Sequence, residues 1–113
     1  MIASDILRGN TEMIILSQLV GNDSYGYQIN KNILMKSNGE LELKEATLYT
    51  VFRRLEEAGE IESYWGDENT GARRKYYSIT EKGMQTLNKL TDEWEKAKAT
   101  IDNLIVGEVN DDE

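Results

Sequence analysis

The most concentrated chemistry in the chain is a run of three cations, Arg73, Arg74 and Lys75. Two runs rich in β-formers, 61–65 and 73–79, flank a turn of Gly, Asp and Asn and predict a β-hairpin with these cations near its tip. Cations at a hairpin tip suit contact with DNA phosphates or the minor groove. The alternative is an ordinary charged edge strand that discourages aggregation.

Catalytic and metal-binding side chains are scarce, because the chain has no Cys and no His. Disulfides and thiol chemistry are excluded, and the commonest metal ligand and general base are missing. No nucleophile–base pair or tight carboxylate cluster stands out, so we expect no enzyme, no metal site and no cofactor. No apolar run reaches the roughly eighteen residues of a membrane span, and no signal peptide is visible, so we expect a cytoplasmic protein without membrane contact.

The formal net charge of −8 argues against DNA binding, because DNA-binding domains are usually basic. The charge is unevenly spread: residues 1–79 carry nine Lys and Arg against twelve Asp and Glu, and residues 80–113 carry four against nine. Since salt screens charges beyond roughly 8–10 Å, the local charge matters more than the total. The end of the chain, 107–113, is acidic and expected to be disordered.

Helical periodicity predicts three helices ahead of the hairpin, over about 11–20, 25–36 and 44–58. Asn10 or Thr11 is the expected N-cap of the first and Ser24 that of the second. Residues 41–43 alternate and suggest a short extended segment. Gly59 is the expected left-handed stop after the third helix. The third helix should bury four apolar residues at helical spacing: Leu48, Val51, Phe52 and Leu55.

A long final helix is predicted from Thr80, a good N-cap, to about residue 105. Its large apolar residues recur at steps of three and four, the spacing of a coiled-coil seam: Leu87, Leu90, Trp94, Ala97, Ile101 and Leu104. At 1.5 Å per residue the rod is roughly 37 Å long, more than a domain of this size can cover. We therefore expect the stripe to be the interface of a homodimer.

The order of elements predicts a mostly α fold with a small β-hairpin: a winged helix-turn-helix over 1–79 and a dimerisation helix over 80–106. The third helix would enter the major groove of double-stranded DNA and the wing would reach the neighbouring backbone. The candidate DNA-binding residues are Lys44, Thr47, Tyr49, Thr50 and Arg53 on the helix, and Arg73, Arg74 and Lys75 on the wing.

Alternatives remain open for several of these residues. Tyr49 is equally suited to a half-buried core position. Arg53 and Arg54 are also compatible with a solvated helix face on which they pair with Glu56 or Glu57. The whole domain could instead be a winged-helix protein-interaction module whose acidic surface meets a basic partner.

Three segments resemble the PadR family of transcriptional regulators: EATLY at 45–49, RRLEEAG at 53–59 and GARRKYYSITEKG at 71–83. The resemblance implies a homodimeric repressor that binds a palindromic operator and controls a nearby transporter operon. Thr50 stands where the family often has Pro, as in a short subgroup similar to the multidrug-binding repressor LmrR.

That subgroup has a Trp near the dimer axis, beside a flat apolar pore for planar aromatic drugs, and Trp94 matches its position. Helix-one residue Glu12 would also face the pore. Lys98 stands where the drug-binding relative has an acid, which leaves the preferred ligand charge open. A Trp94 that simply plugs the interface is the alternative. The implied ligand-binding residues are Trp94, Met13, Ser17, Leu90 and Lys98.

Overall fold

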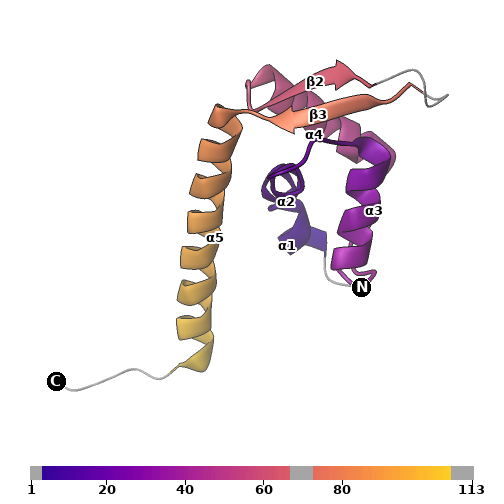
Figure 1. The fold of residues 1–113 in the computed structure, drawn as a ribbon. Helices are drawn as coiled ribbons and strands as arrows, with labels where there is room; N and C mark the ends of the chain where they lie inside the picture. Colours follow the sequence, from indigo (N-terminus) through magenta and orange to yellow (C-terminus); the bar gives the residue numbers. More distant parts are fainter. Residues whose placement is uncertain (1–3, 67–72, 108–113) are drawn as a thin grey trace.

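The described part of the chain, residues 4–66 and 73–107 of a computed structural model, is a helical unit with a small sheet from which one long helix extends (Figure 1). The elements are α1 (Ser4–Arg8), α2 (Thr11–Ser17), β1 (Ser24–Tyr25), α3 (Gly26–Lys36), α4 (Glu45–Glu57), β2 (Ile61–Trp65), β3 (Lys75–Ile79) and α5 (Glu81–Val106). This arrangement confirms the winged helix-turn-helix with a long C-terminal helix.

The N-terminal helices differ from the sequence-based expectation. A short helix, α1, precedes α2, and α2 ends at Ser17 because the amides of Gln18 and Leu19 bond three residues back. The prediction of a side-chain cap at the start of α2 is wrong. Asn10 makes no capping bond, and the Thr11 hydroxyl instead donates to the carbonyls of α1 residues.

The sheet has a third strand that the sequence pattern does not predict. Its order is β1-β3-β2, all antiparallel, with Ser24 opposite Tyr77 and Ser63 opposite Tyr77 on the other side. Ser24 therefore belongs to a strand and is not the N-cap of α3, a position that Tyr25 occupies without a side-chain bond. A two-residue strand is too short to give an alternating pattern.

The core lies where α2, α3 and α4 meet the inner face of the sheet. The four residues predicted to be buried on α4 are all buried, and the ring of Phe52 stacks on that of Tyr77 with centroids 4.1 Å apart. Burial raises the pKa of the Tyr77 hydroxyl to about 12. Gly59 has φ of 76°, as expected for a left-handed helix stop.

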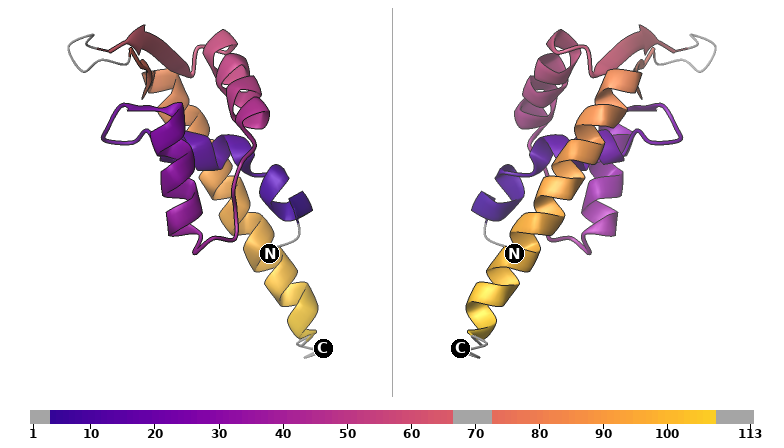
Figure 2. Two further views of the ribbon diagram at one scale, coloured as in Figure 1. Left: turned by 90° about the vertical axis from the view of Figure 1, so that its right-hand side faces the viewer. Right: turned by 90° about the vertical axis from the view of Figure 1, so that its left-hand side faces the viewer.

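The apolar stripe of α5 is divided between two environments. Leu87 is buried in the core of its own subunit and Leu90 packs against that core, whereas Ile101 and Leu104 are 52% and 75% exposed. The last turns of α5 project beyond the other helices and strands of the described residues (Figures 1 and 2). The stripe is thus not one continuous dimer seam: its first two residues join α5 to α2. The turn expected at 66–71 and the acidic tail lie, apart from Gly66 and Gly107, outside the described residues.

Candidate nucleic-acid interface

The second helix of the helix-turn-helix, α4, turns a polar face to solvent. Its buried residues lie on one side, and with 100° between successive residues the opposite side carries Ala46, Thr50 and Arg53, all exposed. The Thr50 hydroxyl donates to the carbonyl of Ala46 at 2.8 Å. This bond uses the hydroxyl proton and leaves the Thr50 methyl group and oxygen lone pairs for a partner. A thymine methyl or a donor on a base edge suits such a surface.

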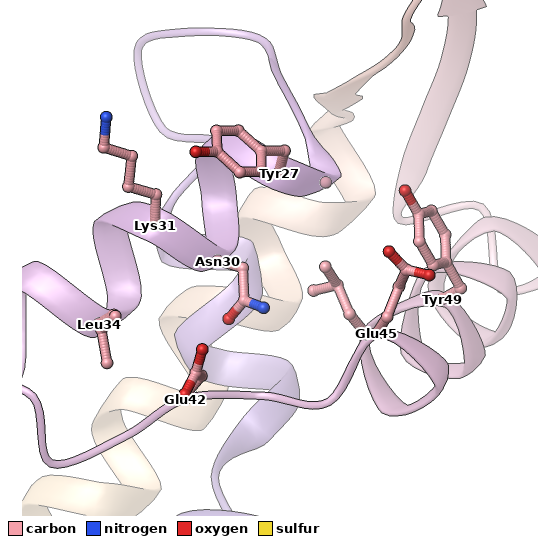
Figure 3. A pocket seen from close by; sticks show the side chains of 9 residues that line it. Tyr27, Asn30, Lys31, Leu34, Glu42, Glu45 and Tyr49 are labelled. Atoms are coloured by element: carbon pink, nitrogen blue, oxygen red, sulfur yellow. The ribbon is translucent and has the colours of Figure 1, made fainter.

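Asn30 sets the position at which α4 begins. Its side chain projects from α3 toward the segment at 41–44 (Figure 3), where its amide donates to the Leu43 carbonyl at 2.8 Å and its oxygen accepts from the Leu43 amide at 3.2 Å. This two-way bond fixes an extended backbone that belongs to no sheet. Lys44 follows as the exposed N-cap residue of α4. Sequence reasoning missed Asn30, because a bond across thirteen residues leaves no periodic signal.

Tyr49 stands between two hollows of opposite charge. The first, here called the acidic groove, has a volume of about 310 Å³ and lies between α3 and the start of α4 (Figure 3). It carries the carboxylates of Glu42 and Glu45 beside Lys31. The second, here called the wing cleft, has a volume of about 490 Å³ and lies between the start of α3, α4 and the hairpin. Its lining residues are Tyr25, Gly26, Tyr27, Tyr49, Trp65, Arg73, Arg74 and Lys75.

Aromatic rings hold the cations of the wing cleft in place. The guanidinium of Arg73 lies 5.0 Å from the Trp65 ring centroid, and that of Arg74 lies 4.8 Å from the Tyr25 ring centroid. The Lys75 ammonium lies 5.8 Å from the Tyr77 ring. These cation–π contacts orient the exposed side chains of all three cations in the wing cleft. The wing cleft is therefore the hollow of the two that suits a phosphate backbone.

Tyr49 reaches the wing cleft because residue 26 is glycine. A Cβ at position 26 would lie 2.7 Å from the Tyr49 hydroxyl oxygen, so any larger residue would displace the ring. The Tyr49 side chain is 44% exposed and its ring meets Phe52 edge-on at 5.6 Å. One side of the Tyr49 ring thus packs on the core, as the core alternative expected, and its hydroxyl faces the start of α3. Contact between Tyr49 and DNA stays a prediction.

Arg54 has a different role from Arg53. Its Nε and Nη2 atoms both lie 2.9 Å from Oε2 of Glu12 on α2. The pairing suggested by the sequence, with Glu56 or Glu57, is not the one that the structure shows. Arg54 thereby points along the flank of α4 toward α2, whereas Arg53 lies on the exposed face.

Trp94 lies beside a cavity of about 450 Å³ between α5 and the α1–α2 corner. This Trp94 cavity brings together predicted ligand residues Met13, Leu90 and Trp94 with the charged side chains of Arg8, Glu12, Arg54 and Glu93. It does not include Ser17, whose hydroxyl donates to Ile14, or Lys98, which pairs with Glu95 at 3.2 Å. Two of the five predicted ligand residues therefore lie outside it.

No helix within residues 4–66 and 73–107 combines the length and the apolar composition that a membrane span needs. In the same ranges, no three acidic side chains come together in a way that could hold a metal ion.

A family model described as the transcriptional regulator PadR-like family matches residues 15–89. The chain belongs to the PadR-like family. Members of this family are DNA-binding transcriptional repressors, not enzymes. The matched range spans α3, α4, the wing and the start of α5, which includes every residue of the wing cleft.

Relatives cover nearly the whole chain. An uncharacterized protein of Lysinibacillus sphaericus is 45% identical over 107 residues, which make up 95% of this chain and 98% of the relative. A transcriptional regulator from Clostridium thermocellum is 46% identical, covers 91% of this chain and 97% of its own, and superposes with a TM-score of 0.85. A PadR family regulator from Clostridium difficile is 34% identical, with coverage of 85% and 98% and a TM-score of 0.75.

Proposed function

We propose that this PadR-like protein is a homodimeric repressor that binds a palindromic operator. Each subunit places the exposed face of α4, with Lys44, Thr47, Thr50 and Arg53, in a major groove. The wing cleft holds the adjacent phosphate backbone through Arg73, Arg74, Lys75 and the Tyr49 hydroxyl. The observation that carries the proposal is the wing cleft itself, where three cations line one hollow next to α4 in a chain of net charge −8.

Dimerisation through α5 completes the proposed operator complex. A helix-turn-helix dimer needs its two recognition helices about 34 Å apart to meet successive major grooves. On the second half of α5, Trp94 is half-buried and the other stripe residues are exposed in the subunit, which supports pairing with a second copy from Trp94 onward: Trp94, Ala97, Ile101 and Leu104. Leu87 and Leu90 are left out of this proposed seam, because Leu87 is buried in its own subunit and Leu90 packs against that core.

The test is a gel-shift titration of a palindrome from the protein's own promoter region against a scrambled duplex, at several salt concentrations. We expect tighter binding to the palindrome and a salt-dependent affinity for both duplexes, because phosphate contacts release counterions. Equal affinity for both sequences at every salt concentration would contradict the proposal.

A charge-reversal pair separates DNA binding from the alternative, a protein-interaction module that meets a basic partner. The variant Arg73→Glu with Lys75→Glu should abolish DNA binding. The control, Lys89→Glu with Lys96→Glu, changes the net charge equally but on α5, away from the wing cleft. Similar losses in both variants would indicate that total charge matters and the wing cleft does not.

The Trp94 cavity supports a second element of the proposal, release of DNA by a planar aromatic ligand, as in the LmrR-like subgroup. Trp94 and Leu90 offer apolar surface, while Glu93 offers a carboxylate that suits a cationic ring system. Ligand would favour a dimer whose recognition helices no longer match the half-sites. Planar aromatics should quench tryptophan fluorescence in the wild type. If quenching persists in Trp94→Ala, it comes from Trp65 and the ligand proposal fails.

A further inference from the structure

A further pocket borders α4 on the side away from the wing. This α1 notch has a volume of about 310 Å³ and lies between α1, α2 and α4. It combines two guanidinium groups with threonine hydroxyls and otherwise small side chains: Arg8, Thr11, Ala46, Thr47, Thr50, Val51 and Arg54. Two of these residues, Ala46 and Thr50, also lie on the exposed face of α4, so the notch opens beside that face.

The notch and the wing cleft lie on opposite flanks of α4. At 100° per residue, Thr47 and Arg54 point to one side of the face that carries Thr50, and Tyr49 points to the other. Thr47 and Arg54 line the α1 notch, whereas Tyr49 lines the wing cleft. A helix inserted in the major groove, which is about 12 Å wide, has a phosphate backbone on each flank. The wing cleft meets one backbone, and the notch lies where the other would pass.

Within the notch, Arg8 is the guanidinium placed to accept a new anion. Arg54 is held by Glu12 at 2.9 Å, which commits part of its donor capacity. Arg8 contacts Asp5 of its own helix at 3.6 Å, and both side chains are at least 75% exposed. An exposed ion pair of that length contributes little energy, so exchanging Asp5 for a phosphate costs little.

The α1–α2 corner fixes where Arg8 stands relative to α4. The Asn10 side-chain amide donates to the Ile6 carbonyl at 2.8 Å, and the buried Thr11 hydroxyl donates to the Arg8 carbonyl at 3.1 Å. These bonds tie α1 to the start of α2, and Glu12 in the next position reaches α4 through Arg54. The left view of Figure 2 shows α1 beside the N-terminal end of α4. These bonds therefore fix the position of Arg8 relative to α4.

We infer that Arg8 is a phosphate-binding residue of the DNA interface, contacting the backbone on the flank of α4 opposite the wing. This inference rests on the proposed function, because it requires α4 to enter the major groove. A phosphate contact from Arg8 positions the protein on the duplex without reading sequence. With Arg8 on one flank of α4 and the wing cleft on the other, cations contact the phosphate backbone on both sides of the recognition helix.

The test compares Arg8→Gln with Lys96→Gln in DNA titrations over a range of salt concentrations. The two positions are matched: side-chain exposures are 75% and 78%, and each cation pairs with an acid one turn away on its own helix. We expect Arg8→Gln to weaken binding to palindromic and scrambled duplexes by a similar factor, about tenfold. The slope of log affinity against log salt should fall by about one. Lys96→Gln should match the wild type.

The conservative variant Arg8→Lys keeps the charge and should restore most of the slope, which a merely structural role would not do. Wild-type affinity and slope in Arg8→Gln would overturn the inference, and so would an affinity loss without a change of slope. If the wild type itself shows no preference for the palindrome, the proposed function fails, a result distinct from failure of Arg8 alone.

Discussion

Gly83, in the first turn of α5, packs directly on the backbone of Glu60, in the turn that follows α4. A Cβ at position 83 would overlap the Glu60 carbonyl oxygen and lie 2.7 Å from Cγ1 of Ile79. Two bonds reinforce this contact: the Thr80 amide donates to the Glu60 carbonyl at 3.1 Å, and the Thr86 hydroxyl donates to its carboxylate at 2.7 Å. The angle between α5 and α4 is therefore fixed within the subunit. In the proposed dimer, that angle sets the distance between the recognition helices.

The variant Gly83→Ala should destabilise the protein by about 1–3 kcal/mol, because the added methyl group forces α5 away from the Glu60 turn. Urea unfolding followed by circular dichroism measures this change. Gly9→Ala is the control, since a Cβ there meets its nearest atoms at 3.6 Å and 3.8 Å, which is ordinary contact. Equal stability of Gly83→Ala and the wild type would show that the contact is loose in solution.

The two neighbouring arginines of α4 should respond differently to substitution. Arg53→Gln should reduce discrimination between operator and scrambled DNA by about 1–3 kcal/mol, because Arg53 lies on the face that would meet base edges. Arg54→Gln should leave discrimination nearly intact, since its guanidinium is bonded to Glu12. Competition gel shifts measure both. An equal loss of discrimination in the two variants would contradict the assignment of Arg53 to the reading face.

The two halves of α5 should separate folding from assembly. Leu87→Ala should lower the free energy of unfolding by about 2–5 kcal/mol, because Leu87 is buried in its own subunit. Leu104→Glu should leave the subunit folded but dissociate the proposed dimer, since Leu104 is 75% exposed. Sedimentation and thermal unfolding distinguish the two effects. A Leu104→Glu protein that remains dimeric would exclude the second half of α5 as the interface.

Tyr77 should make stability fall at alkaline pH. Burial raises the pKa of its hydroxyl in the folded protein to about 12, against 10.0 for an ordinary tyrosine. The stabilisation is therefore complete below pH 10, where the hydroxyl is neutral in both states. It is lost as pH rises from about 10 toward 12, because the unfolded state releases the proton first.

Urea unfolding of the wild type and of Tyr77→Phe between pH 8 and 11 tests this dependence. The Phe variant should lose less stability above pH 10 than the wild type. Tyr64 contributes in the same direction, since a hydrogen bond to Asp23 raises the pKa of its hydroxyl, so some dependence should remain in the variant. The same loss in both proteins would show that Tyr77 does not titrate in this way.

The amino-acid sequence by itself determined the elements whose signals are local. The four buried residues of α4 follow from helical spacing, Gly59 from its place after that helix, and Thr80 from cap chemistry, since its hydroxyl accepts from the Gly83 amide at 3.0 Å. The basic residues of the wing were likewise visible as a run. Each of these features depends on residues within a few positions along the chain, so the sequence alone is enough to predict it.

Tertiary structure alone decided which distant side chains meet. The Asn30–Leu43 bond, the Glu12–Arg54 pair and the support of Arg73 and Arg74 by Trp65 and Tyr25 join elements without a common period. The division of the α5 stripe has the same origin. An apolar residue at seam spacing serves equally well against its own core or a partner, and the packing of α5 on α2 assigned Leu87 to the core. Leu104 lies beyond the reach of that core and stays exposed.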